Sequence, residues 1–152
     1  MISPNHPRGY GNDKNCQITI KFDASQMVLI TIEDFSVEFG DPSCPYDYLA
    51  IFDGDTTTSS MIGQRLCGER LNVTTYQSTG NAMTLQFHTD ASETRKGFKI
   101  FVDSVKSNYI ISTLYLKEKN QCAISKTFYL VILAVKFFRS VLKKNWSTLL
   151  ST

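Results

Sequence analysis

The chain has 152 residues, of which 42% are hydrophobic and 20% are charged. This composition predicts a folded domain with its own core and excludes wholesale disorder. The net charge of +2 is distributed unevenly, and the chain divides into an acidic part and a basic part. Residues 1–104 hold 8 Lys and Arg against 13 Asp and Glu, whereas residues 105–152 hold 8 Lys and Arg against Glu118 alone. An acidic first part disfavours nucleic-acid binding.

Alternating and β-branched segments dominate the first part of the chain. After a Pro-, Gly- and Asn-rich start, residues 17–22 alternate strictly, so that Ile18, Ile20 and Phe22 share one face of a half-buried strand. Further strands are predicted at residues 27–32, 35–39, 48–52, 71–76, 83–87 and 98–102, divided by turn signals such as Asp53-Gly54. Little helical periodicity interrupts them. The pattern predicts an all-β antiparallel sandwich over residues 1–104.

The second part, residues 105–152, is a basic tail with a different pattern. Apolar residues recur there at helical spacing, at Leu130, Leu133, Ala134, Phe137 and Val141. This favours an amphipathic basic helix. The apolar run at 128–135 is far shorter than the roughly 20 residues that span a bilayer, which excludes a transmembrane helix. Three alternatives remain open: a helix on an anionic membrane surface, a helix packed on the sandwich, and a poorly ordered extension.

Three carboxylates stand where the β pattern breaks into loops: Glu38, Asp47 and Asp90. If the fold gathers them at one end of a sheet, they form an oxygen-rich pocket that suits a hard cation such as Ca²⁺. The alternative is that they are solvated loop acids, as most Asp and Glu are.

The four cysteines, at positions 16, 44, 67 and 122, follow no zinc-binding spacing. Cys44 and Cys67 flank the predicted strand and turn at 48–54, and a disulfide between them would stabilise the fold by roughly 3 kcal/mol. Two buried free thiols are the alternative. The sequons Asn72-Val73-Thr74 and Asn145-Trp146-Ser147 are glycosylation sites if the chain is secreted.

Taken in order, the motifs of residues 2–102 resemble the CUB domain, the extracellular module of complement proteases, tolloid-type proteases and spermadhesins. The resemblance covers about two thirds of the chain. It is carried by Ser3-Pro4-Asn5-His6-Pro7, Cys16-Gln17-Ile18-Thr19-Ile20, Phe35-Ser36-Val37-Glu38, Cys44-Pro45-Tyr46-Asp47-Tyr48, Asp53-Gly54, Cys67-Gly68, Ser78-Thr79-Gly80-Asn81-Ala82-Met83, Phe87-His88-Thr89-Asp90-Ala91-Ser92 and Gly97-Phe98. It implies a CUB-type, jelly-roll-like β-sandwich, followed by a C-terminal extension that is helical or disordered.

The resemblance also implies a calcium site. Calcium-binding members place acids at the positions of Glu38, Asp47 and Asp90. A backbone carbonyl near Ser92 is expected to add a ligand, and Tyr10 is expected to orient the glutamate. In related domains a basic side chain of the partner pairs with these carboxylates. The implied function is non-catalytic, calcium-dependent and salt-sensitive capture of a Lys or Arg on an extracellular protein. The alternative is that calcium only orders the loops.

The sequence departs from the family near its start. Family members often carry an upstream cysteine that pairs with the equivalent of Cys16, and this chain begins after that position. We therefore expect residues 1–104 to be a CUB-like domain without its usual first cysteine, in a fragment or splice product, with Cys16 left without that partner. Cys122 would make the count even, although no spacing supports the pairing.

Enzymatic function is disfavoured, because His6 and His88 are the only histidines and no GxSxG, HExxH or phosphate-loop motif occurs. The parent protein can still be a secreted protease, since CUB domains occur in such enzymes. The alternative function is a membrane-associated accessory protein anchored by the basic tail. The expected location is extracellular.

Overall fold

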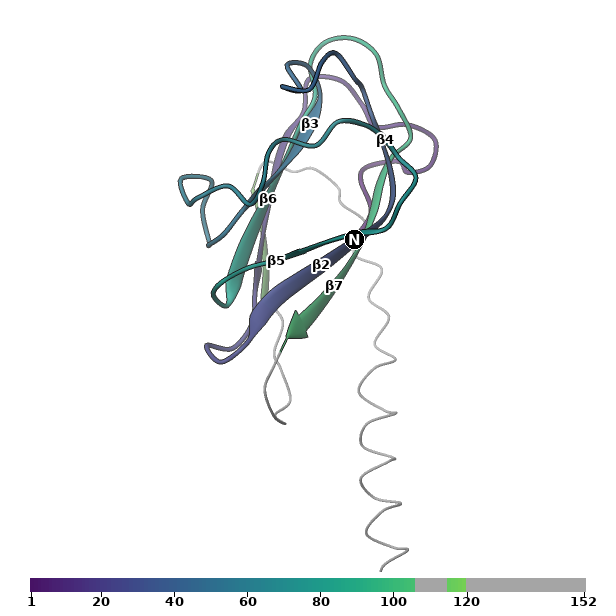
Figure 1. Cartoon of the computed structure of the whole chain (residues 1–152). Coiled ribbons are helices and arrows are strands. Elements are labelled where there is room, and N and C mark those ends of the chain that lie inside the picture. The colour runs from purple at the N-terminus through teal and green to yellow at the C-terminus, as the bar shows by residue number, and fades with distance from the viewer. Residues whose placement is uncertain (106–114, 120–152) are drawn as a thin grey trace, which may run out of the picture.

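The computed structural model describes residues 1–105 and 115–119, and every regular element among them is a β-strand (Figure 1). The all-β prediction is therefore confirmed. The strands are β1 (Asn15–Lys21), β2 (Met27–Val37), β3 (Tyr48–Phe52), β4 (Gly68–Arg70), β5 (Thr74–Gln77), β6 (Ala82–His88), β7 (Gly97–Val105) and β8 (Tyr115–Lys119).

The strands form two antiparallel sheets, which Figure 1 shows as two layers. One sheet has the order β3-β6-β1-β8. In the other, β7 runs along one side of β2, while β4 and β5 follow each other along its opposite side. The pairing of β2 with β7 is long and shifts register between Ile32 and Asp34. This β-sandwich is the architecture that the resemblance implied.

The core lies between the sheets and follows the alternation of the sequence. Ile18 and Ile20 of β1, Val28, Ile30 and Ile32 of β2, and Met83, Leu85 and Phe87 of β6 all point inward and are buried. Successive side chains of a strand point to opposite faces, so a period of two produces one apolar face per strand. Burial of each such side chain stabilises the fold by about 1.5–3 kcal/mol.

Two strand predictions were wrong in their bounds. Residues 27–32 and 35–39 were predicted as separate segments, but β2 continues through Glu33 and Asp34 with a register shift and ends at Val37. Residues 71–76 were predicted as one strand, yet β5 begins at Thr74, and β4 was not predicted at all. After Arg70 the chain stops pairing with β2, and pairing resumes at Thr74. β4 pairs with Phe35–Val37 of β2, whereas β5 pairs with Leu29–Ile32.

The disulfide Cys44–Cys67 is present, with a Cα–Cα distance of 5.7 Å. Cys44 lies in the loop before β3 and Cys67 directly precedes β4, so the bond joins loops that lead into strands of different sheets. Cys16, whose usual upstream partner the sequence does not contain, is disulfide-bonded in the structure, and no free cysteine occurs among the described residues. Cys122 lies outside the described residues.

The strand β8 belongs to the part of the chain that the sequence assigned to the tail. It pairs with β1 from Gln17↔Lys119 to Lys21↔Tyr115 and extends that sheet by one strand. The predicted amphipathic helix, and with it membrane anchoring through the tail, falls on residues outside the described ranges. Within those ranges, no helix could cross a bilayer.

The N-terminal segment, residues 1–14, is held along residues 90–100. The Ser3 amide donates to the Phe98 carbonyl at 2.9 Å, the Phe98 amide donates to Ser3 Oγ at 3.0 Å, and the Tyr10 amide donates to the Arg95 carbonyl at 3.2 Å. Gly97 has a φ of +90°, and a Cβ there would lie 1.9 Å from Ser3 Oγ. Glycine is therefore required at this close approach.

Asp34 ties the same segment to β2 through ion pairs. His6 Nε2 lies 3.0 Å from its carboxylate, and Lys96 contacts the second carboxylate oxygen. Burial acts to raise the pKa of Asp34, but the hydrogen bonds from Lys96 and His6 outweigh it and hold the pKa below its usual value. Ionised Asp34 therefore stabilises the folded state.

We predict that Cys44→Ser plus Cys67→Ser lowers the free energy of unfolding by about 3 kcal/mol, because the unfolded chain regains loop entropy. Denaturant unfolding without reductant measures the loss. Reduction of the wild type should give a loss at least as large, because it also opens the bond of Cys16. An unchanged unfolding midpoint in the double variant would contradict the structural role.

A second prediction concerns pH. A carboxyl group with a depressed folded-state pKa contributes stability above its unfolded pKa of about 3.9, and this is lost as pH falls through the folded value. Asp34→Asn should therefore destabilise the protein at pH 6, and the difference from wild type should shrink below about pH 4. Urea unfolding at each pH measures it. The matched control is Asp103→Asn on the exposed face of β7; identical profiles for the two variants would refute the role of Asp34.

Candidate metal centre

Strand ends bring the three predicted carboxylates together. Glu38 follows the last residue of β2, Asp47 precedes the first residue of β3, and Asp90 lies two residues after β6. Since β3 and β6 are antiparallel with Tyr48 opposite His88, the start of one strand meets the end of the other. Glu38 reaches the same place from the second sheet. We call this group of Glu38, Asp47 and Asp90 the acidic pole.

The geometry of the acidic pole suits a cation. One carboxylate oxygen from each residue lies within 4.8 Å of the other two. Two oxygens bound to one Ca²⁺ at about 2.3–2.6 Å can be separated by up to about 5 Å, so the spacing fits a shared ion. Glu38 is 7% exposed and Asp47 is 0% exposed. Their atoms Glu38 Oε2 and Asp47 Oδ2 are buried and make no hydrogen bond.

Buried carboxylate oxygens without a partner are costly, because the charge has left water and no donor replaces it. A hard divalent cation would supply the missing interaction for both atoms at once. The donor set consists of oxygen atoms throughout, which matches the preference of Ca²⁺. The residues present therefore fit the metal that the resemblance implies.

Hydrogen bonds from the backbone fix each acid in place. The Tyr10 hydroxyl accepts the Glu38 N–H at 3.0 Å. Asp47 Oδ1 accepts the Asp90 N–H at 2.8 Å, and Asp90 Oδ1 accepts the Ser92 N–H at 2.8 Å. One oxygen of Asp47 is thus held by the scaffold, while the other is buried without a hydrogen-bond partner. Such pre-organisation favours metal binding, because little freedom is left to lose.

The charges at the acidic pole oppose one another. Burial raises the pKa of Glu38, and repulsion from Asp47 and Asp90 raises it further. Burial also raises the pKa of Asp47, against the hydrogen bonds from Tyr10 and from the Asp90 amide. Burial raises the pKa of the Tyr10 hydroxyl as well, and the Asp47 carboxylate adds to this effect. Attraction from Arg95 acts on Glu38 in the opposite direction, but burial and repulsion outweigh it, so the pKa of both buried acids stays raised.

Supporting contacts that sequence reasoning missed surround the site. Thr89 is buried, its hydroxyl accepts the Lys14 N–H at 2.9 Å and donates to the Gly11 carbonyl at 2.9 Å. The Asp13 N–H donates to the Asp90 carbonyl at 2.7 Å. These hydrogen bonds hold the N-terminal segment against the loop that carries Asp90. No spacing in the sequence marks these partners, which are far apart along the chain.

A stack of three side chains braces the strand ends next to the acidic pole. The Arg65 guanidinium lies 4.0 Å from the centre of the Tyr48 ring, and Tyr48 stacks on His88 with 5.0 Å between ring centres. Tyr48 follows Asp47 directly and His88 precedes Asp90 by two residues. The stack, a cation–π contact joined to ring stacking, steadies both ligand-bearing strand ends. Arg65 could not be identified from the sequence, since nothing there indicates its proximity to Tyr48.

The remaining predicted site residues lie as follows. Tyr10 is buried with its ring edge-on to Phe87, 5.0 Å between centres. Ser92 donates its amide to Asp90, whereas the role of its carbonyl as a ligand stays a prediction. Asn72 lies apart from the acidic pole, in the exposed connection between β4 and β5.

Fold and site together define a disulfide-linked antiparallel β-sandwich with an acidic cluster at one end. A family model described as the CUB domain matches residues 1–101. The chain belongs to the CUB domain family, whose members are generally non-catalytic modules.

Known relatives contain this domain within much longer chains. Tolloid-like protein 1 of Mus musculus is 39% identical over 99 residues, which is 65% of this chain and 10% of the relative. Cubilin of Canis lupus familiaris is 33% identical over 111 residues, 73% of this chain and 3% of the relative. The chain thus spans a small part of the curated relatives that it matches.

Solved structures show the same architecture. The full extracellular region of zebrafish Gpr126/Adgrg6 matches with a TM-score of 0.61 and 34% identity, over 70% of this chain and 13% of that one. The CUB1-EGF-CUB2 domain of human MASP-1/3 matches with a TM-score of 0.63 and 21% identity, over 70% and 41%. The second likeness concerns the fold alone.

A third prediction follows from the repulsion at the acidic pole. In chelator, Glu38→Gln should raise the thermal unfolding midpoint, because one of three repelling carboxylates is removed. In calcium, the wild type should gain about 2.7 kcal/mol at a concentration 100 times Kd, and the variant should gain less. Thermal melts with and without Ca²⁺ measure both effects.

Glu69→Gln is the matched control, because it removes an equal charge from an exposed position on β4. It should shift neither the chelator midpoint nor the calcium response by a comparable amount. If Glu38→Gln and Glu69→Gln behave alike under both conditions, the acidic pole is not a metal site.

Proposed function

We propose that this chain is a non-catalytic extracellular recognition module that binds one Ca²⁺ at the acidic pole and captures a Lys or Arg side chain of a partner protein. The observation that carries the proposal is the pair of buried, unpartnered oxygens Glu38 Oε2 and Asp47 Oδ2 beside Asp90. The chain's membership of the CUB family supports the extracellular setting.

The charge of the site explains why a basic partner fits. Three carboxylates and one Ca²⁺ leave a net charge of −1, and Asp90 is only half-buried, so its outer side can be reached. The exposed acid Glu93 also acts on Glu38, but it is paired with Arg95 at 2.7 Å, so the negative charge offered to a partner comes from the acidic pole itself. A bound cation supplies the charge that holds the three acids in one arrangement. The remaining negative charge attracts an ammonium or guanidinium group.

Aromatic side chains at the edge of the acidic pole support the same proposal. Phe39, next to Glu38, is 60% exposed, and Tyr46, next to Asp47, is 46% exposed. The Tyr46 ring lies over Gly40, where a Cβ would come within 2.5 Å of it. Lys and Arg have apolar stems that pack on such surfaces while the charged head reaches the acids. The acidic pole thus offers aromatic rings for the apolar stem and carboxylates for the charged head of a basic side chain.

We predict that a lysine-bearing peptide binds the full chain in Ca²⁺ and is released by chelator. Raising ionic strength from 0.1 M to 1 M, which shortens the Debye length from about 10 Å to about 3 Å, should weaken binding. Asp90→Asn should reduce the affinity by a factor of ten or more, since a close charge pair contributes about 1.5 kcal/mol or more. Fluorescence anisotropy of the labelled peptide measures each case.

Two matched controls isolate the charge pair. The same peptide with acetylated lysine keeps the stem and loses the charge, and Asp103→Asn removes an exposed acid on β7. Equal binding of the acetylated peptide would overturn basic capture. An affinity that does not change between calcium and chelator would overturn the role of the metal in binding.

A further inference from the structure

The connection between β4 and β5, residues 71–73, interrupts the edge of a sheet. β4 and β5 lie on the same side of β2, opposite β7, and each is short. Between them the chain turns away from β2 and presents Leu71, which is 89% exposed, and Val73, which is 65% exposed. Unpaired edge strands beside exposed apolar side chains favour association with other chains. A hydrophilic cover over this edge would oppose such association.

The glycosylation sequon Asn72-Val73-Thr74 overlaps this connection and ends on the first residue of β5. Asn72 is exposed between Leu71 and Val73, and no side-chain hydrogen bond of its amide is found to another residue in the described ranges. The Thr74 hydroxyl donates to the Asn72 carbonyl at 3.2 Å, which places the sequon in a bend at the surface. Accessibility of Asn and of the hydroxyl-bearing residue is what a glycosylation acceptor needs.

We infer that Asn72 carries an N-linked glycan that covers Leu71 and Val73 and shields the β4–β5 edge. In the modification, the Asn72 amide nitrogen bonds to C1 of an oligosaccharide on a lipid diphosphate donor. The bond from C1 to the diphosphate oxygen breaks, the lipid diphosphate leaves, and the amide nitrogen loses one proton. No group is oxidised or reduced. The glycan is a large hydrophilic body on a surface that is otherwise apolar.

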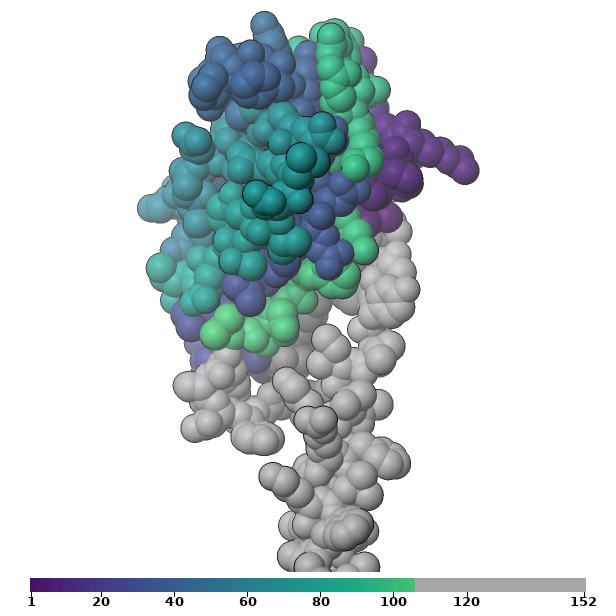
Figure 2. Space-filling view, turned by 45° about the vertical axis from the view of Figure 1, so that its right-hand side comes forward, coloured from purple at the N-terminus to yellow at the C-terminus, as the bar shows by residue number. Residues whose placement is uncertain are grey.

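The position of Asn72 keeps the glycan away from the acidic pole. Gly68 lies opposite Val37, next to Glu38, whereas Arg70 lies opposite Phe35, and the chain continues in that direction to Asn72. Every two residues along the strand increase the distance from the acidic pole by about 6.6 Å. In Figure 2 the loops around residues 40–46 and 90–95, blue and light green, meet at the top, and the teal surface of the β4–β5 region lies below them.

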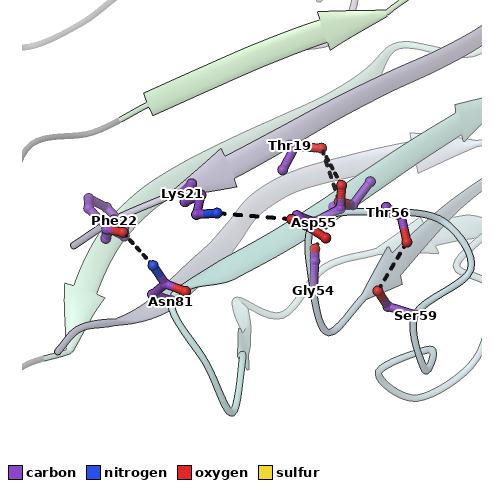
Figure 3. A network of polar contacts seen from close by, with 9 residues as sticks. Thr19, Lys21, Phe22, Gly54, Asp55, Thr56, Ser59 and Asn81 are labelled. Carbon is purple, nitrogen blue, oxygen red and sulfur yellow. Dashed lines mark hydrogen bonds and ion pairs between the residues drawn. The ribbon is translucent and has the colours of Figure 1, made fainter. Parts of the chain in front are cut away.

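A polar network occupies the opposite end of the β3-β6-β1 sheet and needs no ligand to explain it. Figure 3 shows Lys21 reaching Asp55 and the Asn81 amide donating to the Phe22 carbonyl at 2.8 Å. Asp53 accepts from the amide and hydroxyl of Thr79. These contacts close turns between strands. The β4–β5 connection is different, because its apolar side chains are left uncovered by the described residues.

The inference rests on the extracellular part of the proposed function but not on calcium or partner binding.

To test the modification, the full chain is directed into the secretory pathway of a mammalian cell by an added signal sequence. Peptide mapping after enzymatic release of N-glycans in heavy-oxygen water then reads the conversion of Asn72 to Asp, separately from Asn145. We expect conversion at Asn72 in most secreted molecules, complete loss in Thr74→Ala, and retention in Thr74→Ser. Thr75→Ala, one residue further on β5, should match the wild type.

The shielding role has its own readout. Native removal of the glycan should increase self-association in sedimentation velocity, and Leu71→Ser plus Val73→Ser should reverse the increase. Calcium-induced shifts in melting should be unchanged in Asn72→Gln, so failure here and failure at the acidic pole are distinguishable. Unmodified Asn72 in secreted and membrane-fraction protein would overturn the modification. A glycan whose removal leaves the sedimentation coefficient distribution unchanged, or a second copy bound through Leu71 while the glycan is present, would overturn the shielding.

Discussion

The burial of Glu38 and Asp47 side by side is the constraint on which the rest of the structure depends. Two carboxylates out of water repel each other and lack donors for one oxygen each. Such an arrangement persists only if the surrounding scaffold holds it, or if a cation balances it. The scaffold does so from several directions, since the Tyr10 hydroxyl, the Asp90 amide and the Arg65–Tyr48–His88 stack all act on the ligand-bearing strand ends.

The N-terminal segment and the disulfide connect this site to global stability. Residues 1–14 contribute no named strand, yet they deliver Tyr10 and run along the loop that carries Asp90. The Cys44–Cys67 bond links the loop before Asp47 to the strand that pairs with the end of β2, just before Glu38. Loops that would otherwise be the least stable part of a sandwich are thereby fixed from both sheets.

The acidic pole and the β4–β5 connection occupy different parts of the molecule. The acidic pole lies where strands from both sheets meet their connecting loops. The β4–β5 connection lies midway along the edge of one sheet, where an uncovered surface is a liability rather than a binding site. A hydrophilic cover there leaves the pole free. The separation follows from the order β4-β2-β5, in which two short strands share one side of a longer neighbour.

The sequence by itself determined the β-sandwich, most strand positions and the three acids, because alternation with period two and loop-ending motifs are local signals. Tertiary structure alone decided which half of β2 pairs with β4 and which with β5, so Leu71 and Val73 became exposed instead of forming a strand. It also decided that β8 joins β1 and that Arg65 and Thr89 support the site. The physical reason is that pairing register, burial and charge compensation depend on residues far apart in the chain, which no local pattern encodes.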